Sequence, residues 1–301
     1  MVFRNLFAGP PKNPELQLEH DQDVSHWRSP YGLLSRTDAS IHSQGIALHD
    51  GLGFYQFEAS HRLQRFHRAP AFGPTLENPR FAVGMDLQQR RRVVAALGVE
   101  SPSDKPFHSL RETTLQFTAV SAPPGDLKGK KENYWLYFLN YSSTRSFLPN
   151  IPLPGASYTI PTRSGWTYSL GLPFLSISYM DFPHWSFQAT GGPYFYSAAL
   201  SYGPPAFQVG LSTSWSQTAY FLSERSLKEE RLFIDQKEVA LNMKCPLSEK
   251  LFLEGKIAYR FDQSFRTGKS YEKTTAPTED LGSSAVFSLH LKARLDSPSD
   301  Q

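Results

Sequence analysis

The second half of the chain alternates between apolar and small or polar residues with a period of two. The pattern is clearest in residues 166–172, 207–216, 251–262 and 287–295. In residues 207–216, for example, Gln, Gly and Ser occupy every even position. A strand whose two faces meet different surroundings has this pattern, so we expect each run to be a strand.

The first half shows the same period less regularly, in short runs near 46–48, 55–63, 81–87 and 115–119. Residues 88–98 instead favour a short helix within a loop, ending at Gly98. We expect three regions: a flexible N-terminal segment at 1–38, a β-barrel at 39–296 and a polar tail at 297–301.

Apolar and polar residues alternate along the strands of both a membrane barrel and a soluble β-sandwich, so strand length is the feature that distinguishes the two folds. The later runs are about 10 to 14 residues long, whereas sandwich strands are nearer 5 or 6. Short connections at 162–165, 203–205 and 246–250 indicate hairpins in sequence order. Longer polar segments are then expected as extracellular loops, at 99–111, 122–132, 222–230 and 264–282.

Aromatic residues gather near the ends of the expected strands, as the interfacial girdles of a membrane barrel require. Ordinary cross-strand aromatic pairs are the competing interpretation. The residues concerned are Tyr134, Trp135, Tyr141, Trp166, Tyr179, Trp185, Tyr194, Tyr202, Trp215 and Tyr220. We predict an all-β fold: a closed antiparallel transmembrane up-and-down β-barrel of about 12 strands, with 10 or 14 as alternatives.

Composition changes this picture in a few respects. Mean hydropathy is −0.41, and no stretch of about 18 apolar residues occurs among the 301, which excludes a spanning helix. The net charge of +3 gives no argument for nucleic acid, and the single Cys245 forms no internal disulfide. Residues 1–11 are too short and interrupted for an export leader, which counts against an exported protein unless the leader lies upstream of Met1.

Residues 140–158, with the motif Asn-Tyr-Ser-Ser-Thr-Arg-Ser-Phe-Leu-Pro-Asn, carry a resemblance to a known family. Gly171–Phe174, Pro183–Phe187, Glu230–Phe233 and Tyr259–Phe265 follow in the order of the later blocks. Over about 133–295 the chain resembles a family of bacterial outer-membrane β-barrel proteins of unknown function. The resemblance implies a fold and a compartment, the bacterial outer membrane, but no activity or catalytic residue.

Charged residues on the polar faces of the last strands are the main candidate site. They would point into the barrel, where buried charges need partners. We favour a mixed-charge network that plugs the lumen over one that lines a wet pore. Its members are Glu238, Lys244, Glu254, Lys256, Arg260, Asp262, Lys292 and Arg294. Arg145 and Arg231, within the family blocks, are further candidates for internal ion pairs, or else rim arginines.

Other chemistry is weakly indicated. A catalytic His184 is less favoured than a turn histidine, and His61 and His67 would be about 20 Å apart on one strand, too far to share a metal. The run Arg90–Arg92 fits lipid phosphate or lipopolysaccharide as well as a solvated loop. No cofactor is expected. The partner expected is outer-membrane lipid, and the oligomeric state is left open.

We therefore expect a narrow pore or a structural component of the envelope, and no enzyme. Two alternatives remain open at this stage. A barrel enzyme acting on lipid would place a Ser and a His within about 3 Å at one rim. A soluble periplasmic β-sandwich that binds a ligand would have no apolar outer belt.

Overall fold

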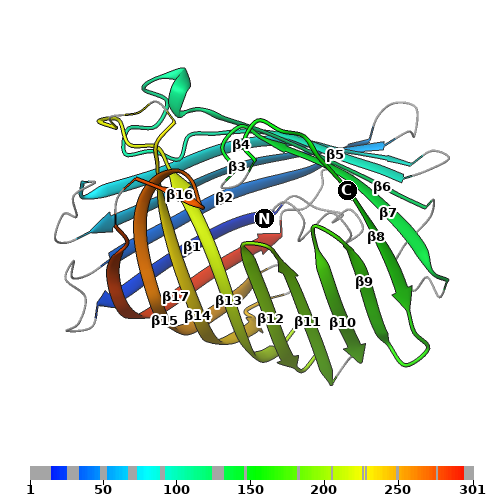
Figure 1. Cartoon of the computed structure of the whole chain (residues 1–301). Coiled ribbons are helices and arrows are strands. Elements are labelled where there is room, and N and C mark those ends of the chain that lie inside the picture. The colour runs from blue at the N-terminus through cyan, green and yellow to red at the C-terminus, as the bar shows by residue number, and fades with distance from the viewer. Residues whose placement is uncertain are drawn as a thin grey trace.

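The computed structural model shows one antiparallel sheet of 17 strands, with a single-turn 3₁₀ helix at Leu110–Glu112 (Figure 1). It describes residues 15–25, 34–47, 53–66, 73–88, 92–123, 132–145, 148–181, 184–204, 206–225, 227, 229–248, 251–275 and 277–294. The strands are β1 (Glu15–Ser25), β2 (Leu34–Ala47), β3 (Gly53–Phe66), β4 (Thr75–Gln88), β5 (Arg92–Glu100), β6 (Thr114–Ala122), β7 (Tyr134–Ser142), β8 (Leu153–Pro161), β9 (Trp166–Leu172), β10 (Leu175–Asp181), β11 (Trp185–Gly192), β12 (Phe195–Tyr202), β13 (Gln208–Tyr220), β14 (Arg231–Pro246), β15 (Leu251–Ser270), β16 (Lys273–Thr274) and β17 (Glu279–Arg294).

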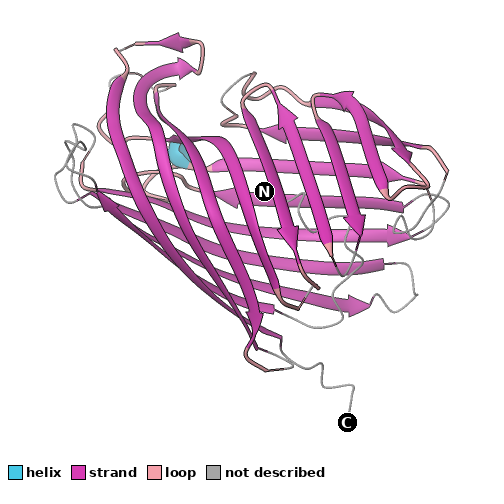
Figure 2. Cartoon of the chain, turned by 90° about the horizontal axis from the view of Figure 1, so that it is seen from below, coloured by secondary structure: helices cyan, strands magenta, loops and turns pink. Residues whose placement is uncertain are grey.

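Strands that follow one another in sequence are neighbours in the sheet, which curves into a barrel (Figures 1 and 2). The two-residue β16 extends the β15 hairpin, and β15 also pairs with β17. At the other end of the sequence, β1 pairs with β2 on one side and with β17 on the other. The first and last long strands of the chain therefore lie side by side.

The described residues form 17 strands, more than the expected 12, 10 or 14, and β1 and β2 account for part of the difference. Both contain residues from the segment expected to be flexible, of which 15–25 and 34–38 lie in these strands. Backbone pairing on both sides holds β1 in the sheet, so it needs no regular apolar pattern. Residues 1–14, 26–33 and the tail at 297–301 lie outside the described part.

β5 corrects the helix expected at 88–98. Leu97 is exposed on one face, while Val94 on the other face is buried against Val120 of β6 and packs with Phe138. Because both faces of β5 meet apolar surroundings, the strand has no polar face and its sequence is a continuous apolar run. A run of that kind does not distinguish a strand from a helix.

The connections divide between two ends of the barrel. We call the terminal end the one where β1 begins and β17 finishes, and the loop end the opposite one. The connection at 122–132 joins β6 to β7 at the terminal end, together with the short turns at 162–165, 203–205 and 246–250. It was expected to be an extracellular loop on the same side as 99–111 and 222–230, which lie at the loop end. The end of the barrel at which a connection lies depends on the direction of the strands that it joins, and not on its length.

The barrel has walls of unequal length (Figure 1). The short wall, β9–β12, has strands of 7 or 8 residues, fewer than the roughly 9–11 typical of spanning strands. The tall wall, β14, β15 and β17, has strands of 16 to 20 residues. β13, with 13 residues, separates the two walls.

Large apolar side chains cover the outer face in rows that cross the strands. One row joins five strands through successive registered pairs: Leu200, Leu211, Leu241, Ile257 and Phe287. Their side chains are 41–58% exposed. We call this surface the outer belt. A second part of it crosses β3, β4 and β5 through Phe57, Val83 and Leu97.

Aromatic pairs border the outer belt at the terminal end. Trp135 and Tyr158 have ring centroids 5.0 Å apart, Trp166 and Tyr179 4.8 Å, and Trp185 and Tyr202 4.9 Å. Each pair joins neighbouring strands, so they form an arc from β7 to β12. Tyr196 and Trp215 pair at the loop end, with centroids 6.2 Å apart. Tyr220, by contrast, is buried, so the girdle prediction is wrong for it.

Candidate functional site

The polar faces of the tall wall bring three of the predicted network residues together. Glu238 accepts a hydrogen bond from Nε of Arg260 at 2.9 Å and lies 3.4 Å from Nζ of Lys256. Arg260 is only 1% exposed. The Glu238 carboxylate therefore has a cationic partner on each side. Charges buried in a protein need such partners to offset the cost of removing them from water.

The other predicted network members divide into separate groups. Nζ of Lys244 lies 3.9 Å from Glu254, nearer the terminal end. Asp262 is a correction: it pairs with Lys237, and its side chain is 63% exposed. An irregularity between Arg260 and Gln263 shifts the register, and Asp262 has φ +52°. The side chains of Lys292 and Arg294 lie outside the described part of the structure.

The inner face of the tall wall is buried near its centre. Ala240, Ala258 and Val286 are registered neighbours and form a buried cluster between the charged pairs. The inner face of the short wall differs, because it carries mainly small hydroxyl side chains that are half-buried or exposed. These include Ser169, Ser176, Ser178, Ser186, Thr190, Ser197 and Ser201.

The β5–β6 loop crosses the barrel at the loop end. Ser103 forms two backbone hydrogen bonds with Glu77 of β4, at 2.8 and 2.9 Å. On its other side, Pro102 accepts a hydrogen bond from the backbone N–H of Phe221, just after β13. Six strands separate β4 from β13 by the shorter way round the sheet, namely β3, β2, β1, β17, β15 and β14. The loop therefore links two distant walls.

Polar side-chain contacts fix this crossing. Asp104 accepts hydrogen bonds from the backbone N–H of Ser223 at 2.7 Å and from its hydroxyl at 2.6 Å. Glu112 lies 3.7 Å from Arg225, and both side chains are buried. Each contact joins the β5–β6 loop to the β13–β14 loop. We call these contacts and the Ser103 bridge the cross-tie.

An apolar cluster lies beside the cross-tie and also joins distant walls. Its buried members come from β3 and β4 on one side and from β13, β14, β15 and β17 on the other. They are Phe66, Leu76, Tyr220, Leu232, Ile234, Phe265 and Leu281. The tall wall therefore leans over at the loop end and packs against β3 and β4, as Figure 1 shows. Strands from distant parts of the sheet are therefore in contact at that end.

Arg145 and Arg231, the further candidates for internal ion pairs, lie close together at the loop end. Nη1 of Arg231 donates hydrogen bonds to the backbone oxygens of Thr144 at 2.8 Å and of Arg145 at 2.9 Å. Arg145 in turn donates to both the backbone and side-chain oxygens of Asn140, at 2.9 and 2.6 Å, and to the backbone oxygen of Ile151 at 3.3 Å. The acceptors of these hydrogen bonds are neutral oxygens.

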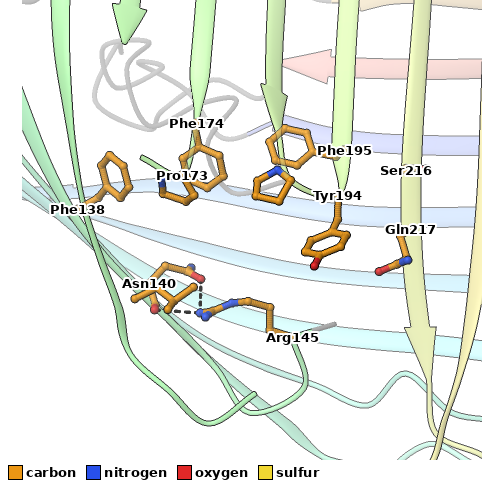
Figure 3. A pocket seen from close by; sticks show the side chains of 11 residues that line it. Phe138, Asn140, Arg145, Pro173, Phe174, Tyr194, Phe195, Ser216 and Gln217 are labelled. Atoms are coloured by element: carbon orange, nitrogen blue, oxygen red, sulfur yellow. Dashed lines mark hydrogen bonds between the residues drawn. The ribbon is translucent and has the colours of Figure 1, made fainter. Parts of the chain in front are cut away.

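Two cavities adjoin Arg145 and Asn140. The first, about 280 Å³, is lined mainly by aromatic and proline side chains of β7, β12 and the turns beside the short wall (Figure 3). The second, about 310 Å³, is lined mainly by polar groups of β4–β7 and β13, among them Glu100 and Gln116. Arg145, Asn140 and Gln217 line both. The two cavities thus share one polar boundary.

Two groups near the cavities have shifted pKa values. Burial lowers the pKa of Arg145, yet a guanidinium keeps its proton at neutral pH, so the boundary carries a positive charge. The hydrogen bond from Tyr194 to Glu272, at 2.7 Å, raises the pKa of Tyr194, and burial adds to the effect. Tyr194 is therefore a neutral hydroxyl at neutral pH.

The remaining predicted residues lie elsewhere. Arg92 is buried and donates to Asp86 at 3.0 and 3.1 Å, so it does not contact lipid phosphate; Arg90 and Arg91 lie outside the described part. His61 is 3.0 Å from Glu77, and His67 also lies outside. His184 is exposed in the β10–β11 turn. No cluster of metal-binding side chains and no membrane-spanning helix occurs among the described residues.

Sequence reasoning did not predict the cross-tie or the cavities. Arg231 binds a carbonyl 86 residues away, and Ser223 binds Asp104 119 residues away. Loop contacts over such separations leave no periodic signal.

Comparisons with known proteins give weak likenesses. No family model and no curated protein matches the chain. Among solved structures, an outer membrane channel from Pseudomonas putida F1 is similar at TM-score 0.41 and 9% identity, covering 98% of this chain and 100% of that one. A bacterial polysaccharide outer membrane secretin has TM-score 0.40 and 6% identity, covering 95% and 99%. A mutant of the Rh. blastica porin has TM-score 0.33 and 10% identity, covering 94% and 99%. Such low scores establish neither a family nor a function.

Proposed function

We propose that this chain is a closed transmembrane β-barrel of the bacterial outer membrane, and that it forms a narrow pore. The observation that carries the proposal is the outer belt, in which rows of exposed apolar side chains cross the walls in register. A contiguous apolar surface of this extent on a soluble protein would associate or aggregate, whereas lipid solvates it.

Closure is supported by the position of β1, whose two edges pair with β2 and β17. In hydrocarbon every backbone N–H and C=O needs a partner, and a sheet supplies these only when it has no free edge. The single curved sheet with an exposed apolar face also argues against the soluble sandwich, which would bury that face between two sheets.

The path for solutes is best placed along the short wall. Its hydroxyl groups are half-buried or exposed, whereas the centre of the tall wall is buried around an ion pair and the cluster of Ala240, Ala258 and Val286. Towards the loop end this path meets the cross-tie and the two cavities around Arg145. In this proposal the tall wall is a partial plug, and the pore beside it is narrow.

The test is insertion followed by conductance. Purified protein should migrate differently on gels when unheated, and in planar bilayers it should give discrete, small current steps. Ser197→Trp, on the inner face of the short wall, should lower the current per step, while Tyr196→Trp, its neighbour on the outer face, should leave the current unchanged. Heat-dependent migration without any current would retain the barrel and refute the pore.

A further inference from the structure

The outer belt ends, towards the loop end, at an ion pair on the tall wall. On β14 the outward positions run from Met243 through Leu241 to Val239, and the next outward position is Lys237. Lys237 pairs with Asp262 of β15, and their side chains are 37% and 63% exposed. Charged groups are favoured in water or among lipid headgroups and are costly in hydrocarbon. The apolar part of β14 therefore ends before Lys237.

The same border continues onto the neighbouring strands. Lys237 is registered with Trp215 of β13, and Trp215 is registered with Tyr196 of β12. These two aromatic side chains pair at the loop end, in the position of an interfacial girdle. On the opposite side of the barrel, His61 of β3 lies 3.0 Å from Glu77 of β4, beyond the apolar outward positions of these strands. Polar or aromatic groups therefore border the outer belt at the loop end, opposite the aromatic arc at the terminal end.

The outer belt between the two borders is short. On β12 it runs from Tyr202, beside Trp185 at the terminal end, to Tyr196 at the loop end. Residues 196–202 of a strand, at about 3.3 Å each and tilted by about 40°, cover roughly 15–18 Å of bilayer thickness. The apolar band of a typical membrane barrel is about 25 Å tall. On β14 the apolar stretch 239–245 has the same length.

We propose that the outer belt fits a bilayer with a thinner hydrocarbon layer than typical membrane barrels span, so that lipids with short acyl chains are its preferred partners. This inference rests on the proposed transmembrane barrel and names the kind of lipid that surrounds it. It also explains the unequal walls. The tall wall continues beyond Lys237 with further charged groups, such as Asp235 and Arg266 in an ion pair at 3.3 Å. Its extra length therefore lies outside the hydrocarbon.

A bilayer that is too thick for the outer belt has two ways to adapt. It can become thinner around the barrel, or its acyl chains can cover the Lys237–Asp262 pair. Both carry a cost that grows with each ångström of mismatch. The stability of the folded protein should therefore depend on the length of the acyl chains around it.

The experiment measures urea unfolding of the full-length protein in phosphatidylcholine vesicles that differ only in acyl-chain length. Monounsaturated chains of about 14 to 20 carbons vary the thickness and keep the bilayers fluid. We expect the equilibrium constant for folding to be roughly tenfold or more larger in the thinnest bilayer than in the thickest. Equal constants at every chain length, or a maximum at the longest chains, would overturn the inference.

A pair of double variants tests whether Lys237 is the border. Lys237→Leu with Asp262→Asn lengthens the apolar stretch of β14 by one outward position, and Asn accepts the φ of +52° at position 262. We expect the ratio between the thinnest and thickest bilayers to fall roughly twofold or more. The matched control, Lys237→Gln with Asp262→Asn, keeps the position polar and should retain the ratio of the unmodified protein. The same ratio in both double variants would overturn the border.

Failure of this inference and failure of the proposed barrel give different results. A protein that enters none of the vesicles, and whose migration on gels does not depend on heating, overturns both. A protein that inserts but is equally stable at every chain length overturns the fit to a thin bilayer and leaves the barrel.

Discussion

The tall and short walls both have polar inner faces, but the polar groups on the two walls are of different kinds. The tall wall carries full charges that are paired and buried, such as Arg260 with Glu238. The short wall carries hydroxyl groups that remain partly solvated, such as Ser197 and Ser201. Paired charges make an inner face rigid and closed to water, whereas small hydroxyl groups leave space beside them. We therefore expect stability to reside mainly in the tall wall and, in the proposed pore, solutes to pass mainly along the short wall.

The largest effect should come from breaking the buried ion pair of the tall wall. Arg260→Met leaves Glu238 buried with Lys256 as its remaining partner at 3.4 Å, so we expect a loss of about 3–5 kcal/mol in the free energy of unfolding. Urea unfolding in lipid vesicles measures it. The matched change on the short wall, Ser201→Ala, should stay within about 0.5 kcal/mol. Similar losses in both variants would abolish the contrast.

A charge placed in the outer belt should have the next largest effect. Leu211 is 58% exposed and lies between Leu200 and Leu241, so Leu211→Arg would place a cation in hydrocarbon and cost about 2–4 kcal/mol. The adjacent Ser212→Arg turns to the inner face and should cost much less. The same unfolding assay compares them, and a neutral Leu211→Arg would show that this surface does not face lipid.

Removing a contact of the cross-tie should have a smaller effect on stability, and it should also change the current through the proposed pore. Asp104→Ala removes the acceptor of both Ser223 hydrogen bonds, for which we expect a cost of about 1–2 kcal/mol. Because this contact joins the two loops that cross the barrel, the current in planar bilayers should become larger or noisier. An unchanged current would place the cross-tie away from the conducting path.

The short wall itself should tolerate substitution with the smallest change in stability. Thr190→Val keeps the shape of the side chain and removes a hydroxyl from the inner face of β11, so its free energy of unfolding should change by about 0.5 kcal/mol or less. The current should fall modestly, because the path becomes less polar. A large loss of stability would mean that this face is packed, as on the tall wall.

The sequence predicted the fold class well where two faces met two different environments. β13, β15 and β17 alternate clearly because outer and inner residues differ in kind, as at Leu211 and Ser212. It missed β5, where Val94 packs inward against Val120 and Leu97 is exposed outward, so both faces are apolar. It also missed β1, which backbone pairing holds in the sheet.

The candidate site was predicted only in part, for a related reason. Periodicity places residues on faces, and it correctly brought Glu238, Lys256 and Arg260 together. It failed at Asp262, because one irregularity in register exchanges the inward-facing and outward-facing positions of the residues beyond it. It had no access to the meeting of Arg145 and Arg231, which depends on how loops from distant walls fold across the barrel.

Solvent mapping of β12 tests the central claim most directly. With Cys245→Ser as background, single cysteines at positions 196 to 202 would carry spin labels in lipid vesicles, and accessibility to oxygen and to a water-soluble nickel complex would be measured. Labels at Tyr196, Ala198, Leu200 and Tyr202 should favour oxygen, and those at Ser197, Ala199 and Ser201 should favour nickel. Uniform accessibility, or the reverse alternation, would contradict a barrel with lipid outside and water inside.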